Sequence, residues 1–265
     1  MTVVAQVAED APFVGDTVLS LRSVSKHFGG VTALDDVSME LQAARVTALV
    51  GDNGAGKSTL VKCIAGAHTP DSGTLEMEGH AVVLRHPSQA RSMGIEAVFQ
   101  ELALADHLDV VANIFLGREV RRRFGPIALL DNRAMRARAK EIIDGFSINI
   151  PSLRANVRNL SGGQRQGVAI GRAVGWGTKL IIMDEPTAAL GVRETARIEQ
   201  LIRSLGDRGL AVLLISHNLE QVFNVSDVIY VLRRGRLVAR RETGNCTPSE
   251  IVGLITGAKE ADKRD

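Results

Sequence analysis

The chain has 265 residues, and 32 basic side chains against 30 acidic ones leave it a formal net charge of +2. A hydrophobic fraction of 45% with 23% charged residues is typical of a globular protein and excludes a wholly disordered or fibrous chain. Near-neutral charge and only 3% aromatic residues argue against nucleic acid as a partner, because its binding depends on concentrated Lys and Arg and on base stacking.

No segment is predicted to span a membrane, because the longest apolar runs, Leu180–Met183 and Leu210–Ile215, fall far short of the roughly 20 residues that a bilayer requires. The N-terminus has no basic stretch and meets acidic residues early, so we expect no secretory signal. The two cysteines, Cys63 and Cys246, are too few for a disulfide framework or a zinc cluster. These features predict a protein that works in the cytosol.

The first half of the chain begins with strand patterns. Residues 1–16 show no sustained period and are predicted to form a flexible arm. Strand-like runs follow at Val18–Val24, Val37–Leu41, Val46–Val50 and Thr74–Met77. The run Val46–Val50 is apolar without alternation, which is typical of a strand buried on both faces. A helix pattern begins after Lys57.

The second half returns to α/β alternation after a different middle part. Residues from about 87 to 158 are predicted to form a mainly helical insert, with a helix over Asp131–Ile143 and a basic run at Arg121–Arg123. Alternating helices and strands are then predicted at Gly163–Val174, Leu180–Met183, Arg193–Leu205, Ala211–Ile215, Leu219–Val225 and Val228–Leu232. This order implies one domain over residues 17–257 with a mostly parallel sheet covered on both faces. Residues 258–265 are charged and predicted to form a flexible tail.

A phosphate-binding pattern follows the strand Val46–Val50 directly. The sequence GDNGAGKS fits the strand–GxxxxGK[ST]–helix arrangement completely. Its glycines let backbone N–H groups point into one concavity, which also receives the positive end of the next helix. Lys57 can reach the β- and γ-phosphates, and the Ser58 hydroxyl can ligate Mg²⁺. The residues predicted to bind the nucleotide here are Gly51, Asp52, Asn53, Gly54, Ala55, Gly56, Lys57, Ser58 and Thr59.

A pair of acidic residues ends the apolar run Leu180–Met183. A buried parallel strand brings such carboxylates to the crevice at the carboxyl edge of its sheet. Asp184 would hold Mg²⁺, directly or through water, and Glu185 would polarise the attacking water. Acids after an apolar run also cap helices, and this alternative is the weaker one in a chain with a phosphate loop.

The segment LSGGQ, with Leu160 at its start, distinguishes this chain from other phosphate-loop proteins. Ser161 can cap the helix that follows, which leaves the helix dipole and its first N–H groups aimed at an anion. Because one phosphate is already bound at residues 51–58, a second anion site favours a two-fold arrangement, in which this turn in one copy closes on the γ-phosphate bound by the other. The residues predicted to do so are Ser161, Gly162, Gly163 and Gln164.

With these motifs the chain resembles the nucleotide-binding subunits of ABC transporters, over residues 18–257. The resemblance implies an α/β fold: a P-loop NTPase core with a mostly parallel sheet, an antiparallel β subdomain and an inserted helical subdomain. It also implies that Phe28 stacks on adenine, that Gln100 links the Mg²⁺ and water site to the helical subdomain, and that His217 contacts the γ-phosphate. Lys57, Gln100, Glu185 and His217 would then be the catalytic residues.

One position departs from the family pattern. After Leu190 the chain has Gly191, where the family usually has Asp. The missing carboxylate removes a hydrogen bond across the expected dimer and leaves the strength of communication between its two ATP sites open. The phosphate chemistry is not affected.

Three stretches resemble the ATPases of bacterial monosaccharide importers of the ribose, xylose and fructose type, with the single-cassette fructose type the best fit: Phe99–Leu102, Ala112–Glu119 and Glu185–Leu190. This implies ATP hydrolysis at the cytoplasmic face of the inner membrane, with membrane permease subunits and a second copy as partners and a periplasmic sugar-binding protein as an indirect one. Two alternatives stay open. One is an ABC ATPase for a non-sugar solute, and the other is an ABC-type ATPase of DNA maintenance, which the lack of a heptad insert between Gln100 and Leu160 disfavours.

Overall fold

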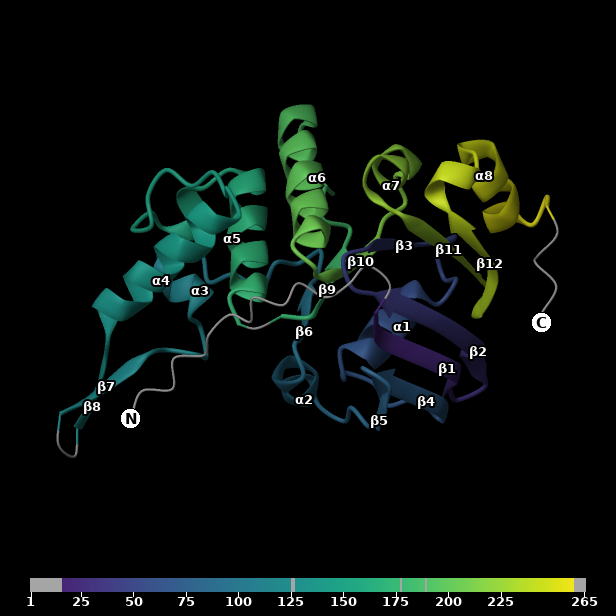
Figure 1. The fold of residues 1–265 in the computed structure, drawn as a ribbon, viewed down its shortest axis with the longest axis horizontal. Coiled ribbons are helices and arrows are strands. Elements are labelled where there is room, and N and C mark those ends of the chain that lie inside the picture. The colour runs from purple at the N-terminus through teal and green to yellow at the C-terminus, as the bar shows by residue number, and fades with distance from the viewer. Residues whose placement is uncertain (1–15, 125–126, 177, 189, 260–265) are drawn as a thin grey trace.

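The computed structural model describes residues 16–124, 127–176, 178–188 and 190–259. Nearly all of the predicted arm (1–16) and most of the predicted tail (258–265) lie outside these residues. Among the described residues, no helix has the length and apolar character needed to cross a bilayer. The described residues form a single α/β body, from which a hairpin projects (Figure 1).

A six-stranded sheet forms the centre of the molecule. Its strands, in spatial order, are β12 (Arg236–Glu242), β11 (Val228–Arg233), β3 (Val46–Val50), β10 (Ala211–Ile215), β9 (Leu180–Asp184) and β6 (Ile95–Val98). All neighbours pair in parallel except β12, which is antiparallel to β11. The register places Ile215 between Leu49 and Asp184. The loops that leave β3 and β9 therefore start from the same edge of the sheet.

Helices cover both faces of this sheet. The helices of the described residues are α1 (Lys57–Ile64), α2 (Pro87–Ser92), α3 (Val110–Ile114), α4 (Asn132–Gly145), α5 (Gly162–Val174), α6 (Val192–Asp207), α7 (Leu219–Val225) and α8 (Pro248–Thr256), of which α3 and α4 pack against α5. Leu213 of β10 packs in the core that contains α1, whereas Val212 and Leu214 pack in the core that contains α5 and α6. Every residue of β3 and β10 is buried, which confirms that these apolar runs are strands covered on both faces.

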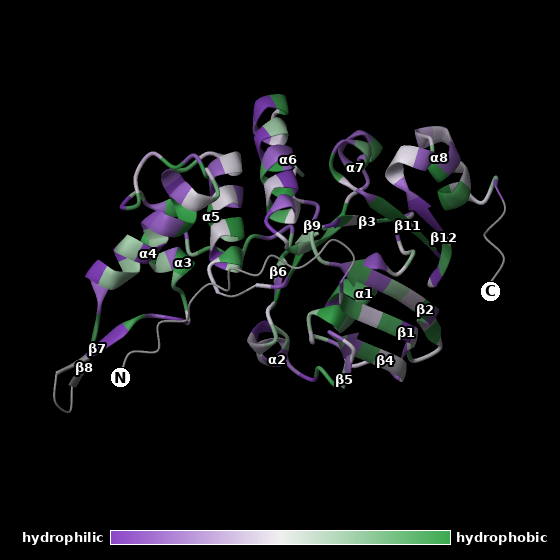
Figure 2. Cartoon of the chain, in the orientation of Figure 1, coloured by the Kyte–Doolittle hydropathy of each residue, from purple (hydrophilic) through white to green (hydrophobic). Residues whose placement is uncertain are grey.

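A second, antiparallel sheet packs beside α1. Its strands are β2 (Val31–Gln42), β1 (Thr17–Phe28), β4 (Ser72–Met77) and β5 (His80–Val82), in that spatial order. Side chains from β1 and β2, such as Leu19 and Leu41, share one core with Leu60 of α1 and Leu49 of β3. The fold is therefore the expected one, a mostly parallel core sheet with an antiparallel β subdomain (Figures 1 and 2).

Within residues 87–158 the structure differs from the expected mainly helical insert. Ile95–Val98 forms β6, which pairs with β9 in the core sheet. Further on, β7 (Arg121–Phe124) and β8 (Ile127–Leu130) form an antiparallel hairpin. The helices within residues 87–158 that pack with α5 are α3 and α4. A run of four residues is too short for its hydrophobic period to separate a strand from a helix.

Candidate functional site

The predicted phosphate loop follows β3 and wraps around its own lysine. The Nζ atom of Lys57 donates hydrogen bonds to the carbonyl oxygens of Gly51 at 2.6 Å and Asp52 at 2.9 Å. Burial lowers the pKa of Lys57, and the negative charges of Glu185, Asp52 and Asp184 oppose that shift. The lysine is thus held at the loop, close to the acids that end β9.

Two glycines of the loop are required by close backbone packing. A Cβ atom on Gly51 would lie 2.2 Å from the carbonyl oxygen of Leu232, and one on Gly56 would lie 2.5 Å from that of Ala33. Gly56 also has a φ of +108°, which is strained for any residue with a side chain. Gly54, by contrast, faces open space. The loop is therefore packed firmly against the protein on one side and open to a ligand on the other.

The acidic pair lies at the carboxyl end of β9, as predicted. Burial raises the pKa of the Asp184 carboxyl, the neighbouring charge of Glu185 raises it further, and Lys57 acts against both. The Asp184 carboxylate, the Ser58 hydroxyl and the Gln100 amide offer the oxygen ligands that Mg²⁺ prefers. No group of three or more His, Cys, Asp or Glu side chains gathers within the described part of the chain. This donor set fits Mg²⁺, which is usually held by one or two carboxylates together with water and substrate phosphates.

Glu185 is held by two contacts from one residue, a backbone hydrogen bond and a close approach of a ring nitrogen. Its Oε1 atom accepts from the backbone N–H of His217 at 3.0 Å and lies 2.8 Å from Nδ1 of the same residue. The Glu185 side chain is 16% exposed, whereas that of His217 is 77% exposed. Glu185 also has a φ of +51°, a strained value for a residue with a side chain. The carboxylate is therefore fixed by its neighbour, while the histidine faces solvent.

Two cavities meet at this pair. One, of about 450 Å³, is lined by Gly51, Asp52, Asn53 and His217, together with Val252 and Ile255 of α8. The other, of about 430 Å³, is lined by Gln100, Glu185 and Gly162. His217 lines the cavity beside the phosphate loop, and Glu185 lines the cavity beside Gln100. The contact between Glu185 and His217 therefore lies between these two cavities.

Phe28 lies at the end of β1 with 45% of its surface exposed. His68 packs its ring edge against Phe28 with 5.3 Å between ring centres, and Lys26 Nζ lies 5.6 Å from the centre of the Phe28 ring. The ring of Phe28 is thus partly open to solvent, and its stacking on adenine stays a prediction. The contact of His68 with Phe28 could not be predicted from the sequence, since no spacing rule connects the turn after α1 to the end of β1.

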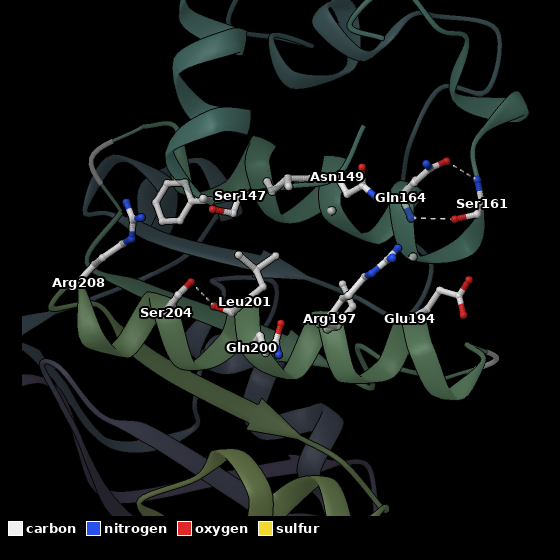
Figure 3. A pocket seen from close by; sticks show the side chains of 15 residues that line it. Ser147, Asn149, Ser161, Gln164, Glu194, Arg197, Gln200, Leu201, Ser204 and Arg208 are labelled. Atoms are coloured by element: carbon white, nitrogen blue, oxygen red, sulfur yellow. Dashed lines mark hydrogen bonds between the residues drawn. The ribbon is translucent and has the colours of Figure 1, made fainter. Parts of the chain in front are cut away.

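The Ser161 turn forms a capping box at the start of α5. The Ser161 hydroxyl accepts from the backbone N–H of Gln164 at 3.3 Å, and the Gln164 side chain accepts from the N–H of Ser161 at 3.0 Å (Figure 3). Ser161 is exposed, and with Glu194 and Arg197 it lines a cavity of about 380 Å³ between α5 and α6. Figure 1 shows α5 well apart from α1. Since Ser161 caps α5 and Lys57 begins α1, the two residues stand on elements that are separated in space within one chain.

A phosphate loop after a buried strand and an acidic pair on the next strand but one, in a mostly parallel sheet, define a P-loop nucleoside triphosphatase. Comparison with known families makes this more specific, because residues 34–188 match the ABC transporter family. The chain belongs to that family. It is an ATP-binding subunit that couples ATP hydrolysis to transport.

Several relatives of the chain are named as ATP-binding proteins of sugar import. It is 47% identical to the xylose/arabinose import ATP-binding protein XylG of Sulfolobus acidocaldarius, over 90% of this chain and 94% of that protein. It is 44% identical to the fructose import ATP-binding protein FrcA of Rhizobium meliloti, over 92% and 96%. The ribose import ATP-binding protein RbsA 2 of Burkholderia cenocepacia is 41% identical over 92% of this chain, which matches 47% of the length of that relative.

Solved structures agree on the fold. A nucleotide-free ATP-binding cassette of an ABC transporter superposes with a TM-score of 0.76 and 26% identity, over 91% of this chain and 95% of that one. The ADP conformation of MJ1267, an ATP-binding cassette of an ABC transporter, gives a TM-score of 0.77 and 27% identity over the same shares. Both support an ATP-binding cassette fold across nearly the whole chain.

Proposed function

We propose that this chain hydrolyses ATP to energise the import of a monosaccharide, a pentose or hexose such as xylose, fructose or ribose. The support is the near full-length similarity to relatives named for xylose/arabinose and fructose import. A relative named for ribose import is about twice as long, so this chain corresponds in length to the first two.

ATP binding is assigned to the loop 51–59 and to Phe28. The phosphates would lie in the open side of the loop, where Lys57 carries a positive charge and α1 begins. Phe28 offers an exposed ring on which adenine can stack. Ser58, Asp184 and Gln100 would hold Mg²⁺, which supplies charge neutralisation for the β- and γ-phosphates.

Hydrolysis is assigned to Glu185, and the contact between Glu185 and His217 is the observation that carries this proposal. A carboxylate fixed by a backbone hydrogen bond and by the nearby ring nitrogen of His217 can orient a water for attack without losing its own position. The exposed ring of His217, together with Lys57, would stabilise charge on the transferring phosphoryl group. Gln100 lines the Glu185 cavity and would report the state of this site to α3 and α4.

The complete site is proposed to need a second copy of the chain. Ser161 is exposed at the start of α5, and α5 lies apart from the phosphate loop of its own chain. A helix start with its capping serine in place presents N–H groups to an anion. In the proposed dimer, Ser161, Gly162, Gly163 and Gln164 of each copy close on the γ-phosphate held by the other.

Transport itself is assigned to partners. The sugar would pass through membrane permease subunits after delivery by a periplasmic binding protein, and this chain would act from the cytoplasmic face of the inner membrane. Opening and closing of the dimer would reach the permease through the part of the chain that follows Gln100. The sugar would never touch this chain, so its identity must come from uptake measurements.

Release of phosphate from ATP tests the catalytic part of the proposal. We expect Glu185→Gln to lower kcat by at least about a hundredfold while ATP still binds, and an ATP-dependent dimer to accumulate. Glu101→Gln is the matched control, because Glu101 is an exposed acid in the same cavity wall. Normal turnover in Glu185→Gln, or an equal loss in Glu101→Gln, would remove the role given to Glu185.

Uptake of labelled sugars tests the transport part. Cells that lack this chain are expected to lose uptake of one pentose or hexose and to regain it with the wild-type chain but not with Glu185→Gln. Unchanged uptake of every monosaccharide, together with normal ATP hydrolysis by the purified chain, would favour a non-sugar solute.

A further inference from the structure

The hairpin β7–β8 projects away from the rest of the molecule (Figure 1). Its register places Arg121 opposite Leu130 and Arg122 opposite Leu129. Residues opposite each other in an antiparallel pair share one face, and adjacent pairs alternate between faces. Each face of the hairpin therefore carries an arginine beside a leucine. Leu129 and Leu130 are 55% and 52% exposed, so the hairpin does not bury them in the protein core.

Positive charge is concentrated in this part of the chain. Residues 118–140 contain eight basic side chains and two acidic ones, whereas the remaining residues contain 24 basic and 28 acidic ones. The small net charge of the whole protein is thus the sum of a strongly basic region, with a charge of +6, and a remainder with a charge of −4. Such a region attracts anions over a distance of about one Debye length, roughly 8 Å at physiological salt.

The basic region continues from the hairpin onto α4. Arg133 and Arg136 are exposed and lie three residues apart, on the part of the helix surface that the buried Met135 and Ala139 leave open to solvent. Within the described residues neither of these arginines has an acidic partner, whereas Arg138 pairs with Glu141. We call the following set the basic hairpin surface: Arg121, Arg122, Leu129, Leu130, Arg133 and Arg136.

We propose that the basic hairpin surface binds the anionic headgroups of the cytoplasmic leaflet, with Leu129 and Leu130 entering the interface between headgroups and acyl chains. Exposed arginines mixed with exposed leucines match such an interface in both charge and polarity. Cytoplasmic loops of membrane proteins carry an excess of Lys and Arg, so a permease would repel this surface. The proposal rests on the transport role given above, but it requires no hydrolysis.

Vesicle co-sedimentation of the full chain tests this inference. The wild-type chain should bind vesicles that contain phosphatidylglycerol, bind pure phosphatidylcholine vesicles far less, and lose affinity as salt increases. Each arginine near an anionic leaflet strengthens binding about fivefold, so Arg133→Glu/Arg136→Glu should weaken it by at least about 25-fold. Glutamates in the first turns of α4 suit the helix dipole, so the variant should fold.

The matched control is Arg85→Glu/Arg154→Glu, which changes net charge equally at two exposed arginines outside the basic hairpin surface. This control should keep most of the binding, and Leu129→Gln/Leu130→Gln should weaken it even at high salt.

Equal loss in both arginine pairs, equal binding to phosphatidylcholine, or no binding by the wild-type chain would overturn the proposal. So would loss of sugar uptake in Arg133→Glu/Arg136→Glu with vesicle binding intact, since that points to a protein partner. Basal ATP hydrolysis by each variant reports its folding, and a failure of the catalytic assignment would appear there instead.

Discussion

Glu185 and His217 form one unit at the scale of single residues. The strained backbone of Glu185 and its largely buried carboxylate both raise the free energy of the folded chain. Such strain is found mainly at functional sites, where the surrounding structure holds the residue in place. The carboxylate is held by the backbone N–H of His217, which donates a hydrogen bond, and by Nδ1 of the same residue at 2.8 Å. Only the Nδ1 contact depends on the His217 side chain. Removing either side chain should therefore damage the same catalytic step.

We predict that the two substitutions are not additive. Glu185→Gln and His217→Ala should each lower kcat about 10²- to 10³-fold, and the double variant should be scarcely worse than Glu185→Gln alone. Steady-state phosphate release at saturating ATP measures this. His80→Ala, a change at an exposed histidine on β5, serves as the control. Losses that multiply in the double variant would show two independent roles.

Asp184 is predicted to reduce the stability of the folded chain at neutral pH. Its pKa is raised by burial and then by Glu185, so folding favours the protonated carboxyl. The stability linked to this group is fully present below the pKa of the unfolded chain and is lost as pH rises through the higher folded pKa. Asp184→Asn should therefore raise the melting temperature of the nucleotide-free protein by a few degrees at pH 7–8, and this gain should disappear in acid. Thermal melts across pH measure it, and a lower melting temperature at pH 7 would make Asp184 a structural residue.

Helix caps separate structural from functional roles at the scale of elements. Ser161 caps α5 and Asp131 caps α4, where the Asp131 carboxylate accepts from the N–H of Ala134 at 2.9 Å. We predict that Ser161→Ala and Asp131→Ala each lower the free energy of unfolding by about 1 kcal/mol. Only Ser161→Ala should also lower kcat. Denaturant unfolding and phosphate release on the same samples test this, and equal kcat in the two variants would leave Ser161 as a cap alone.

Elements with a strong local pattern were predictable from sequence. Val46–Val50, Ala211–Ile215 and Leu219–Val225 match the observed bounds, because continuous apolar runs and a clear helical period identify them. The strand β12 was missed because Arg236, Arg240 and Arg241 leave an edge strand little apolar character. The hairpin β7–β8 was missed for a similar reason, since its arginines read as a solvated basic run.

The candidate site also has features that could be predicted from the sequence and features that could not. The phosphate loop and the acids after β9 were predictable because each motif is contiguous and follows a buried strand. His68 beside Phe28, and Val252 and Ile255 of α8 beside the phosphate loop, depend on contacts between distant segments. The hydrogen bond from His217 to Glu185 also joins residues 32 positions apart, and no spacing rule specifies it.

At the scale of the whole molecule, the two anion-binding segments predicted from the sequence lie apart in one chain. The Ser161 turn and Lys57 lie on separate parts of the chain, and two-fold pairing of identical copies is the simplest way to bring them together. Gly191 caps α6 without a side-chain hydrogen bond, so the carboxylate that the family usually offers there is missing. We expect the two ATP sites of the dimer to work with weak coupling.

Mixing two inactive variants tests this arrangement. A Ser161→Arg chain keeps its own Lys57 and Glu185, and a Glu185→Gln chain keeps its own Ser161, so a mixed dimer contains one intact site. Random pairing before ATP is added makes about half of the dimers mixed, and with weakly coupled sites the mixture should recover about a quarter of the wild-type rate. Each variant alone, at the same total concentration, is the control. A mixture no faster than the sum of its parts would mean that each chain completes its own site, because Ser161 and Glu185 would then have to act in the same copy.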